Sequence, residues 1–319
     1  MTGSADPAAR VSTDLPQLLA HVADSFGLDS VRDWSVLKTG YEDCNIDVTT
    51  TRVRVVVKVF AADRAPGIAA RTADLITRAQ AAGVHHPRLH RDHRGEMVHR
   101  HRGHQILVMD FVPGHTFYDL DRAPSPGELI AIIEQVVRIH GVDAHPAFVF
   151  DPWAITNLVP LAAQVRDLLD TEQRRFVGRA VEGIAGVDRD ALPATLIHAD
   201  LTKGNVLLGE DGSPSVLDFA LANYLPRVQE LAMIAANLTH GAPDPLPTRV
   251  ETIATLYSAA APVPLTATEL AALRAFCHAA AAMELLGALA EWHHGNRSAE
   301  TASLIDVGLA GLRDYDAVT

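Results

Sequence analysis

Residues 195–219 decide the fold of this chain and read Thr-Leu-Ile-His-Ala-Asp-Leu-Thr-Lys-Gly-Asn-Val-Leu-Leu-Gly-Glu-Asp-Gly-Ser-Pro-Ser-Val-Leu-Asp-Phe. A polar loop leads into two short runs typical of β-strands, 206–208 and 215–217. The Glu-Asp-Gly sequence at 210–212 favours a turn between them. Because a β-hairpin brings its two ends together, we expect the residue after the second run to lie beside the loop before the first.

Three residues of this stretch should therefore meet: Asp200, Asn205 and Asp218. Their carboxylate and amide oxygens suit Mg²⁺, which binds through a few protein oxygens together with substrate phosphates. An Asp, four residues, an Asn, then a hairpin ending in Asp-Phe is also the order of the base and metal ligands in kinases. The alternative is an ordinary helix–loop–hairpin with polar loop residues, which would require a coincidence at several constrained positions.

The segments His-Ala-Asp-Leu-Thr-Lys-Gly-Asn-Val-Leu at 198–207 and Val-Leu-Asp-Phe-Ala-Leu-Ala at 216–222 resemble the aminoglycoside phosphotransferase and homoserine kinase superfamily. The resemblance is sharp across 197–222 and loose over 38–238. It implies an α+β, bilobal, protein-kinase-like fold with a small N-lobe (an antiparallel sheet plus helix) and a larger, mainly helical C-lobe. It also implies ATP and Mg²⁺ as cofactors.

The resemblance assigns roles to residues of the loop. Asp200 accepts the proton of a substrate hydroxyl, and Asn205 and Asp218 hold the metal. His198 is expected to brace the loop by hydrogen bonds rather than to transfer protons. For Lys203 two interpretations remain open, a group that neutralises the transferring phosphate or a solvated loop lysine.

Composition agrees with a two-lobed protein of a reducing compartment. The chain is 48% hydrophobic and 21% charged, which is typical of a globular protein. Its 319 residues are too many for one small core, so two lobes or domains are expected. The two cysteines, Cys44 and Cys277, form no disulfide framework or zinc spacing, and no signal peptide opens the chain. The apolar stretch 275–292 contains His and Glu and is interpreted as a buried helix. We expect a soluble, cytoplasmic protein.

Charge is distributed unevenly along the chain. Residues 1–118 hold 14 Lys and Arg against 13 Asp and Glu, whereas residues 119–319 hold 13 against 26. An acidic second part argues against a nucleic-acid partner, which requires basic surfaces. It favours a cationic substrate, although an acidic surface that only maintains solubility explains the charge equally well.

The first part of the chain is expected to form the nucleotide-binding lobe. Residues 1–12 are interpreted as a disordered start, and the N-lobe covers 13–111. A helix is predicted over 14–28, with strands at 34–38, 44–50 and 53–60. Lys58 ends a β-branched run, and the resemblance makes it a ligand of the nucleotide phosphates. Gly40 lies in the turn that would cover them, without a G-x-G-x-x-G or P-loop motif.

The helix predicted over 66–83 departs from the family pattern. Relatives carry a glutamate there that pairs with the strand lysine, whereas this helix has Asp74 as its one carboxylate. Asp74 is therefore the candidate partner of Lys58. If Lys58 lacks an orienting carboxylate, its grip on the phosphates is weakened.

Residues 85–104 hold seven histidines and five arginines. Because histidine is the commonest metal ligand, a metal site is one interpretation of this stretch. However, the alternation over 97–104 predicts a solvent-facing β-hairpin, and no i,i+4 pair of ligands on a helix is evident. A pH-sensitive face or one that contacts polyanions is a further alternative.

The segment 112–118 is predicted as the hinge, after a buried strand at 106–111. In the resembled family, backbone groups around Asp110 and Val112 would bind the adenine edge. The C-lobe, 119–319, begins with a capping box at 125–128 that opens a helix over 129–142. Further helices are predicted at 159–181, 227–238, 298–315 and, after a second capping box, from 266 to 292.

The acceptor pocket is expected among residues of the C-lobe. Its candidates share an acidic or aromatic side chain: Asp119, Asp121, Glu230, Glu284, Glu291 and Trp292. These would suit an amine-bearing hydroxyl compound, such as homoserine, another amino alcohol or an aminoglycoside-like antibiotic. The resemblance thus implies an ATP-dependent small-molecule kinase, and the alternative is a nucleotide-binding pseudokinase that acts as an interaction module.

Overall fold

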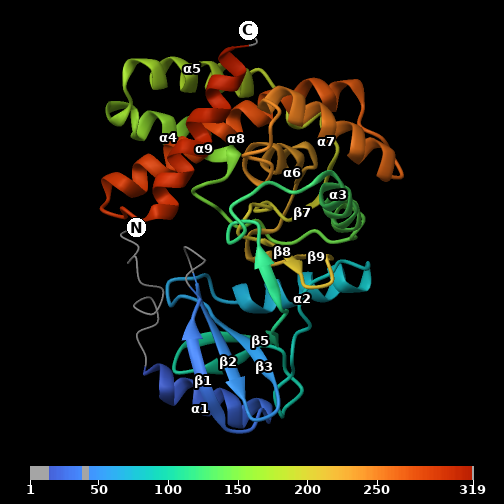
Figure 1. Cartoon of the computed structure of the whole chain (residues 1–319), viewed down its shortest axis with the longest axis vertical. Helices are drawn as coiled ribbons and strands as arrows, with labels where there is room; N and C mark the ends of the chain where they lie inside the picture. Colours follow the sequence, from blue (N-terminus) through green and yellow to red (C-terminus); the bar gives the residue numbers. More distant parts are fainter. Residues whose placement is uncertain (1–13, 38–42, 318–319) are drawn as a thin grey trace.

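The computed structural model describes residues 14–37 and 43–317. Figure 1 shows an antiparallel sheet with two helices below a larger, mainly helical part. The sheet has the strand order β1-β2-β3-β5-β4. This arrangement confirms the predicted α+β, bilobal, kinase-like fold. The predicted disordered start, 1–12, and Gly40 lie outside the described residues.

The N-lobe sheet contains the three predicted strands, although the first begins earlier than expected. Its first three strands are β1 (Val31–Val36), β2 (Cys44–Thr50) and β3 (Arg54–Val59). Every second residue of β2 is buried, because successive side chains of a strand point to opposite faces. Asn45 pairs with Lys58 across β2 and β3, which places the lysine on the face opposite the first helix.

Two helices cover the two faces of this sheet. α1 (Leu15–Phe26) starts at Asp14, whose side chain caps Gln17, and it packs an apolar stripe against the alternate residues of β2 and β3. α2 (Ile68–Ala81) contributes to the other, larger core, which continues into the C-lobe. Figure 1 accordingly shows α2 between the sheet and the helical lobe.

The hairpin predicted in the histidine-rich stretch faces solvent on one side only. The hairpin exists, formed by β4 (His99–His101) and β5 (His104–Asp110), but His99 and His104 are buried. His99 lies 3.0 Å from the ring of His21 on α1, and its other nitrogen lies 3.1 Å from Asp92. The prediction was wrong for this face because β-alternation does not reveal that a helix covers it.

The segment predicted as the hinge contains a short strand, β6 (Gly114–Thr116), in the order β6-β8-β9. Here β8 is Val206–Gly209 and β9 is Pro214–Val216, the predicted hairpin. Gly114 has φ 154°, and a Cβ there would lie 2.3 Å from the carbonyl oxygen of Leu208. Only glycine lets the connecting chain approach the hairpin of β8 and β9 this closely.

The C-lobe contains the predicted capped helices and differs at one long helix. α3 (Pro126–His140) and α8 (Ala267–His293) start at the two capping boxes, and α9 (Ala299–Asp316) ends the described chain. The single helix predicted over 159–181 is wrong. Two helices, α4 (Leu158–Gln164) and α5 (Thr171–Ala185), replace it, because Asp170 and Gln173 form a third capping box that starts a new helix.

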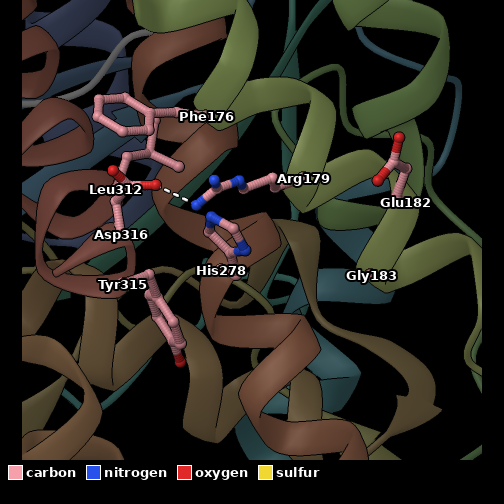
Figure 2. Close-up of a pocket in the computed structure, with 8 residues that line it drawn as sticks. All are labelled: Phe176, Arg179, Glu182, Gly183, His278, Leu312, Tyr315 and Asp316. Atoms are coloured by element: carbon pink, nitrogen blue, oxygen red, sulfur yellow. Dashed lines mark hydrogen bonds and ion pairs between the residues drawn. The ribbon is translucent and has the colours of Figure 1, made fainter. Parts of the chain in front are cut away.

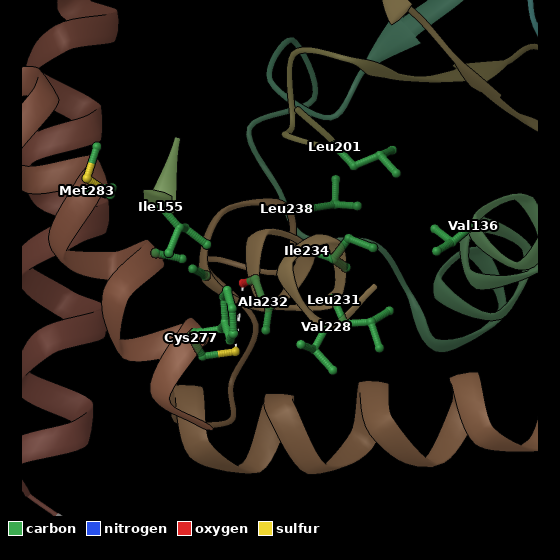
Figure 3. Packing of buried hydrophobic residues seen from close by; sticks show 14 of the residues in the cluster. Val136, Ile155, Leu201, Val228, Leu231, Ala232, Ile234, Leu238, Cys277 and Met283 are labelled. Atoms are coloured by element: carbon green, nitrogen blue, oxygen red, sulfur yellow. Dashed lines mark hydrogen bonds between the residues drawn. The ribbon is translucent and has the colours of Figure 1, made fainter. Parts of the chain in front are cut away.

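Three further elements were not predicted as such: α7 (Leu246–Ala260) and the paired strands β7 (Ala194–Ile197) and β10 (Asn223–Pro226). The helix predicted over 227–238 is present as α6 (Val228–Met233) followed by one π-helical turn, Ile234–Leu238. Figure 3 shows α6 and this turn packed among Cys277 of α8, Val136 of α3 and Leu201 of the loop 198–205, the candidate catalytic loop. The loop therefore rests on a buried apolar base.

The helix α8 is long and apolar enough to cross a membrane by composition alone, yet 72% of its most apolar window is buried inside the protein. That degree of burial is typical of a central core helix. Figure 1 shows α8 among the other C-lobe helices, with α9 beside it.

Candidate active site

The loop between β7 and β8 brings Asp200 and Asn205 together. The side-chain amide of Asn205 donates to the Asp200 carboxylate at 2.6 Å and to the backbone oxygen of the same residue at 2.9 Å. Because this amide donates through its nitrogen, its oxygen is left for another ligand. The hydrogen bonds fix the two side chains relative to each other.

The hairpin places Asp218 beside this loop, as predicted from its length. The N–H of Leu217 donates to the backbone oxygen of Asn205 at 2.8 Å. Asp218 has φ 60°, in the left-handed region, and accepts hydrogen bonds from Ala220 and Lys58. Burial raises the pKa of Asp218, but Lys58 outweighs burial and lowers the pKa to about 2.

Lys58 joins the N-lobe sheet to this carboxylate. It is 3% exposed, and its Nζ lies 2.7 Å from Asp218 and 3.0 Å from Asp43. Burial lowers its pKa, while the two carboxylates outweigh burial and raise the pKa above its usual value. A charged ammonium thus lies between carboxylates from both lobes.

Asp74 does not pair with Lys58. Its carboxylate binds Arg78, one turn along α2, at 2.8 Å, and its side chain is 59% exposed. Arg78 lies at position i+4 on the same helix, where side chains are close enough to form an ion pair. Asp43 contacts Lys58 instead, and sequence reasoning missed it. The available signal was strand alternation, which places Asp43 two residues before Asn45 on the face that carries Lys58.

His198 is completely buried beneath the loop. Its Nε2 donates to the carbonyl of Leu217 at 2.7 Å, and its Nδ1 accepts from the N–H of Asp200 at 3.3 Å. Burial lowers its pKa to about 4, so the ring is neutral at pH 7, and one neutral tautomer satisfies both bonds. These contacts position the loop.

Glu230 does not line an acceptor pocket. Its side chain is completely buried in α6 and accepts from the N–H groups of His198 and Ala199. Burial raises its pKa to about 7, although these hydrogen bonds oppose the shift. Ala199, at φ 69°, occupies a strained conformation. Glu230 therefore acts from below the catalytic loop and stabilises this strained turn.

A second buried carboxylate lies along a chain of hydrogen bonds from Lys203. The N–H of Lys203 donates to Asn237 at 3.0 Å, and the amide nitrogen of Asn237 donates to Glu284 at 2.7 Å. Glu284 is 5% exposed. Burial, with a contribution from Asp151, raises its pKa to about 7. The Lys203 side chain is half-buried, and burial lowers its pKa.

The other predicted acceptor residues lie at more open positions. Asp119 accepts from Thr116 and closes a turn after β6. Asp121 is exposed, and its charge acts on Lys203. Near the end of α8, Glu291 accepts from Asn296, and the Trp292 ring lies under Arg297. Hydrogen bonds through Asn237 connect Glu284 to the catalytic loop. The structure does not bring all six candidates together at one place.

The two residues predicted to bind the adenine edge differ in whether the protein already uses their backbone N–H groups. The N–H of Asp110 donates to the carbonyl of Arg88 at 3.0 Å, and its carboxylate binds His90 at 2.6 Å. Asp110 is thus occupied by the protein. No described residue forms a hydrogen bond with the N–H of Val112, so Val112 is the better candidate.

Figure 2 shows a hollow between α5, α8 and α9. Arg179 and Asp316 form an ion pair across it, and His278 stacks on Tyr315. None of the described residues of the predicted site lines this hollow. We therefore place the candidate active site at the catalytic loop.

The donor set of the loop fits Mg²⁺. Among residues 14–37 and 43–317, no group of three or more His, Cys, Asp and Glu side chains could hold a metal on its own. Asp218 and Asn205 offer one carboxylate and one amide oxygen, and Mg²⁺ usually takes its remaining ligands from phosphates and water.

A sequence profile described as the phosphotransferase enzyme family matches residues 33–292, most of the chain. The chain belongs to this family. It is 28% identical over 221 residues to a homoserine kinase of Methylobacillus flagellatus, covering 66% of this chain and 65% of that protein. A homoserine kinase of Rhodopseudomonas palustris is 25% identical over 210 residues, covering 63% and 62%. The chain thus spans slightly less than two thirds of these relatives.

Solved structures of small-molecule kinases share the fold of this chain. An amicoumacin kinase in complex with AMP-PNP and Ca²⁺ matches with a TM-score of 0.68 and 16% identity, covering 97% of this chain and 95% of that one. A microcompartment-associated aminopropanol kinase gives 0.65 and 16%, covering 96% and 98%. A spectinomycin phosphotransferase with ADP and spectinomycin gives 0.65 and 12%, covering 93% of both.

Proposed function

We propose that this chain transfers the γ-phosphoryl group of ATP to a hydroxyl of a small, amine-bearing molecule. The observation that carries the proposal is the meeting of two lobes at one charged site. Lys58 from the sheet contacts Asp218, which is joined through the Leu217 backbone to the Asp200–Asn205 pair. Kinase-like phosphoryl transfer requires this combination of a phosphate-binding cation, metal ligands and a base.

The residues of the loop divide the chemistry between them. Asp200 accepts the proton of the acceptor hydroxyl as that oxygen attacks the γ-phosphorus and the bond from this phosphorus to ADP breaks, and general-base help of this kind contributes about 10²–10⁴-fold. Asn205 and Asp218 would hold Mg²⁺, which would neutralise charge on the phosphates. His198 and Glu230 keep the loop in place, because they bind its backbone and are themselves buried.

The surroundings of Glu284 support the proposal that the acceptor carries an amine. The loop from Asp151 to Trp153 lies against α8, since a Cβ at Gly287 would meet the Trp153 ring at 2.5 Å. Asp151 and Glu284 are both buried, and their charges interact. An ammonium group near them would relieve that repulsion and restore their charged forms.

Amino alcohols are therefore the first acceptor class, and homoserine is the first compound to test. The matched homoserine kinases and the aminopropanol kinase are named for such substrates. Aminoglycoside-like antibiotics, which also carry amines beside hydroxyls, are the second class. A pseudokinase that acts as an interaction module remains the alternative function, favoured by the absence of a glutamate from α2.

The test is acceptor-dependent ADP release with Mg-ATP and a panel of amino alcohols and aminoglycosides. We expect Asp200→Asn to lose at least about 10²-fold in turnover, whereas Asp167→Asn, at an exposed position of the C-lobe, keeps the wild-type rate. Wild-type ADP release that no acceptor stimulates, with partner binding unaffected by Asp200→Asn, would favour the pseudokinase.

A further inference from the structure

Asp43 is held against Lys58 on the nucleotide side of the sheet. Its side chain is 3% exposed, and Oδ2 lies 3.0 Å from the lysine Nζ. The residue immediately precedes β2, whose next alternate residue, Asn45, pairs directly with Lys58. The contact is therefore a diagonal pair between neighbouring strands.

Two other groups fix the Asp43 carboxylate. The N–H of Ala61 donates to Oδ1 at 3.2 Å. The guanidinium of Arg64 lies 3.3 Å from Oδ1 and 3.4 Å from Oδ2. A buried carboxylate with a backbone donor and two cations has little freedom to rotate, because each movement would break a charge-assisted hydrogen bond.

The helix α2 supplies no such carboxylate. Its one acidic residue, Asp74, binds Arg78 at the surface. Arg71 of the same helix instead donates to backbone carbonyls of the C-lobe, those of Ala147 and Ala220 at 3.0 and 3.2 Å. The helix thus docks the lobes together but leaves the orientation of Lys58 to other residues.

We propose that Asp43 is the positioning residue that holds Lys58 for the phosphates of the nucleotide. The inference rests on the proposed kinase function. Lys58 now shares its charge between Asp43 and Asp218. With a metal and phosphates in the site, Asp218 would bind the metal. Asp43 would then remain as the carboxylate that keeps the ammonium in position. Asp43, at the start of the sheet strand β2, would in this way take the place of the glutamate that α2 lacks.

The proposal distinguishes phosphate binding from adenosine binding. We expect Asp43→Asn to weaken Mg-ATP binding by about tenfold or more and to leave adenosine binding unchanged, as measured by calorimetry on the full chain. Asp43→Glu, which keeps the charge, should restore part of the ATP affinity. Asp74→Asn is the matched control, because this aspartate is exposed and lies on the neighbouring helix.

A double-mutant cycle with Lys58→Met makes the test specific. If Asp43 acts through the lysine, Asp43→Asn has no further effect on ATP affinity in the Lys58→Met background. Equal losses for ATP and adenosine, an unchanged ATP affinity in Asp43→Asn, or additive losses in the cycle would each overturn the inference. Wild-type protein that binds ATP no better than adenosine would overturn the proposed function itself, and with it the role of Asp43.

Discussion

The candidate active site contains two regions of carboxylates whose pKa values are shifted in opposite directions. On the nucleotide side, Asp218 is beside Lys58, and its pKa is lowered to about 2. Under the catalytic loop and along α8, the buried side chains of Glu230 and Glu284 have pKa values that are raised to about 7. Desolvation raises the pKa of all three carboxylates, so the opposite direction at Asp218, whose side chain is 33% exposed, comes mainly from its partner Lys58. A neighbouring ammonium keeps a carboxylate charged, whereas backbone N–H or amide donors only moderate the cost of burial.

The comparison has a functional meaning. Under the proposed function, the nucleotide side stays charged over the physiological pH range and is ready for Mg²⁺ and phosphates. Glu284 would gain its full charge when the ammonium group of an acceptor approaches, whereas Glu230 lies beneath the loop and acts on its stability. Changing one carboxylate in each region should therefore produce different kinds of effect.

The largest effect is expected at Asp218. Asp218→Asn removes the charge that balances Lys58 and would hold the metal, so turnover should fall by about 10³-fold or more. Folding should survive, because Lys58 keeps its contact with Asp43. The measurement is kcat with Mg-ATP and the best acceptor, beside Asp211→Asn in the exposed turn of the same hairpin. Comparable rates in both variants would contradict the assignment of Asp218.

An intermediate effect is expected at Glu230, on stability. Its pKa is raised in the folded protein from 4.5 to about 7, so the folded state holds a proton that the unfolded state has released. Stability therefore decreases as the pH rises from about 4.5 to about 7, by up to about 3 kcal/mol from this group.

The matched variant is Glu230→Gln, which keeps an oxygen for the N–H groups of the loop. Urea unfolding at pH 5 and pH 7.5 should show a smaller pH dependence in this variant than in the wild type. The same pH dependence in both proteins would show that Glu230 is ionised throughout, like Asp218.

The smallest effect is expected at Glu284, on the acceptor. Glu284→Gln should raise KM for an amine-bearing acceptor by about tenfold, the value of one charge-assisted hydrogen bond, and leave KM for ATP unchanged. An acceptor that lacks the amine should not distinguish the two proteins. A change in KM for ATP alone would instead place Glu284 on the nucleotide side.

How much of this site could be predicted depended on how far apart along the chain its residues lie. The meeting of Asp200, Asn205 and Asp218 followed from a hairpin of fixed length, so local geometry was sufficient. The partner of Lys58 required the register of two strands and the orientation of a helix, and the prediction of Asp74 failed there. The position of Glu230 beneath the loop depends on packing between distant helices, which no local pattern contains. The burial of His99 depends in the same way on α1.

The most direct test of phosphoryl transfer is to follow the label from γ-³²P-ATP into homoserine and other amino alcohols. The account predicts a labelled acceptor with wild-type protein and about 10²-fold less with Asp200→Asn. Label that reaches only inorganic phosphate, or equal labelling of the acceptor by both proteins, would contradict the claim that this site transfers phosphate to a hydroxyl with Asp200 as its base.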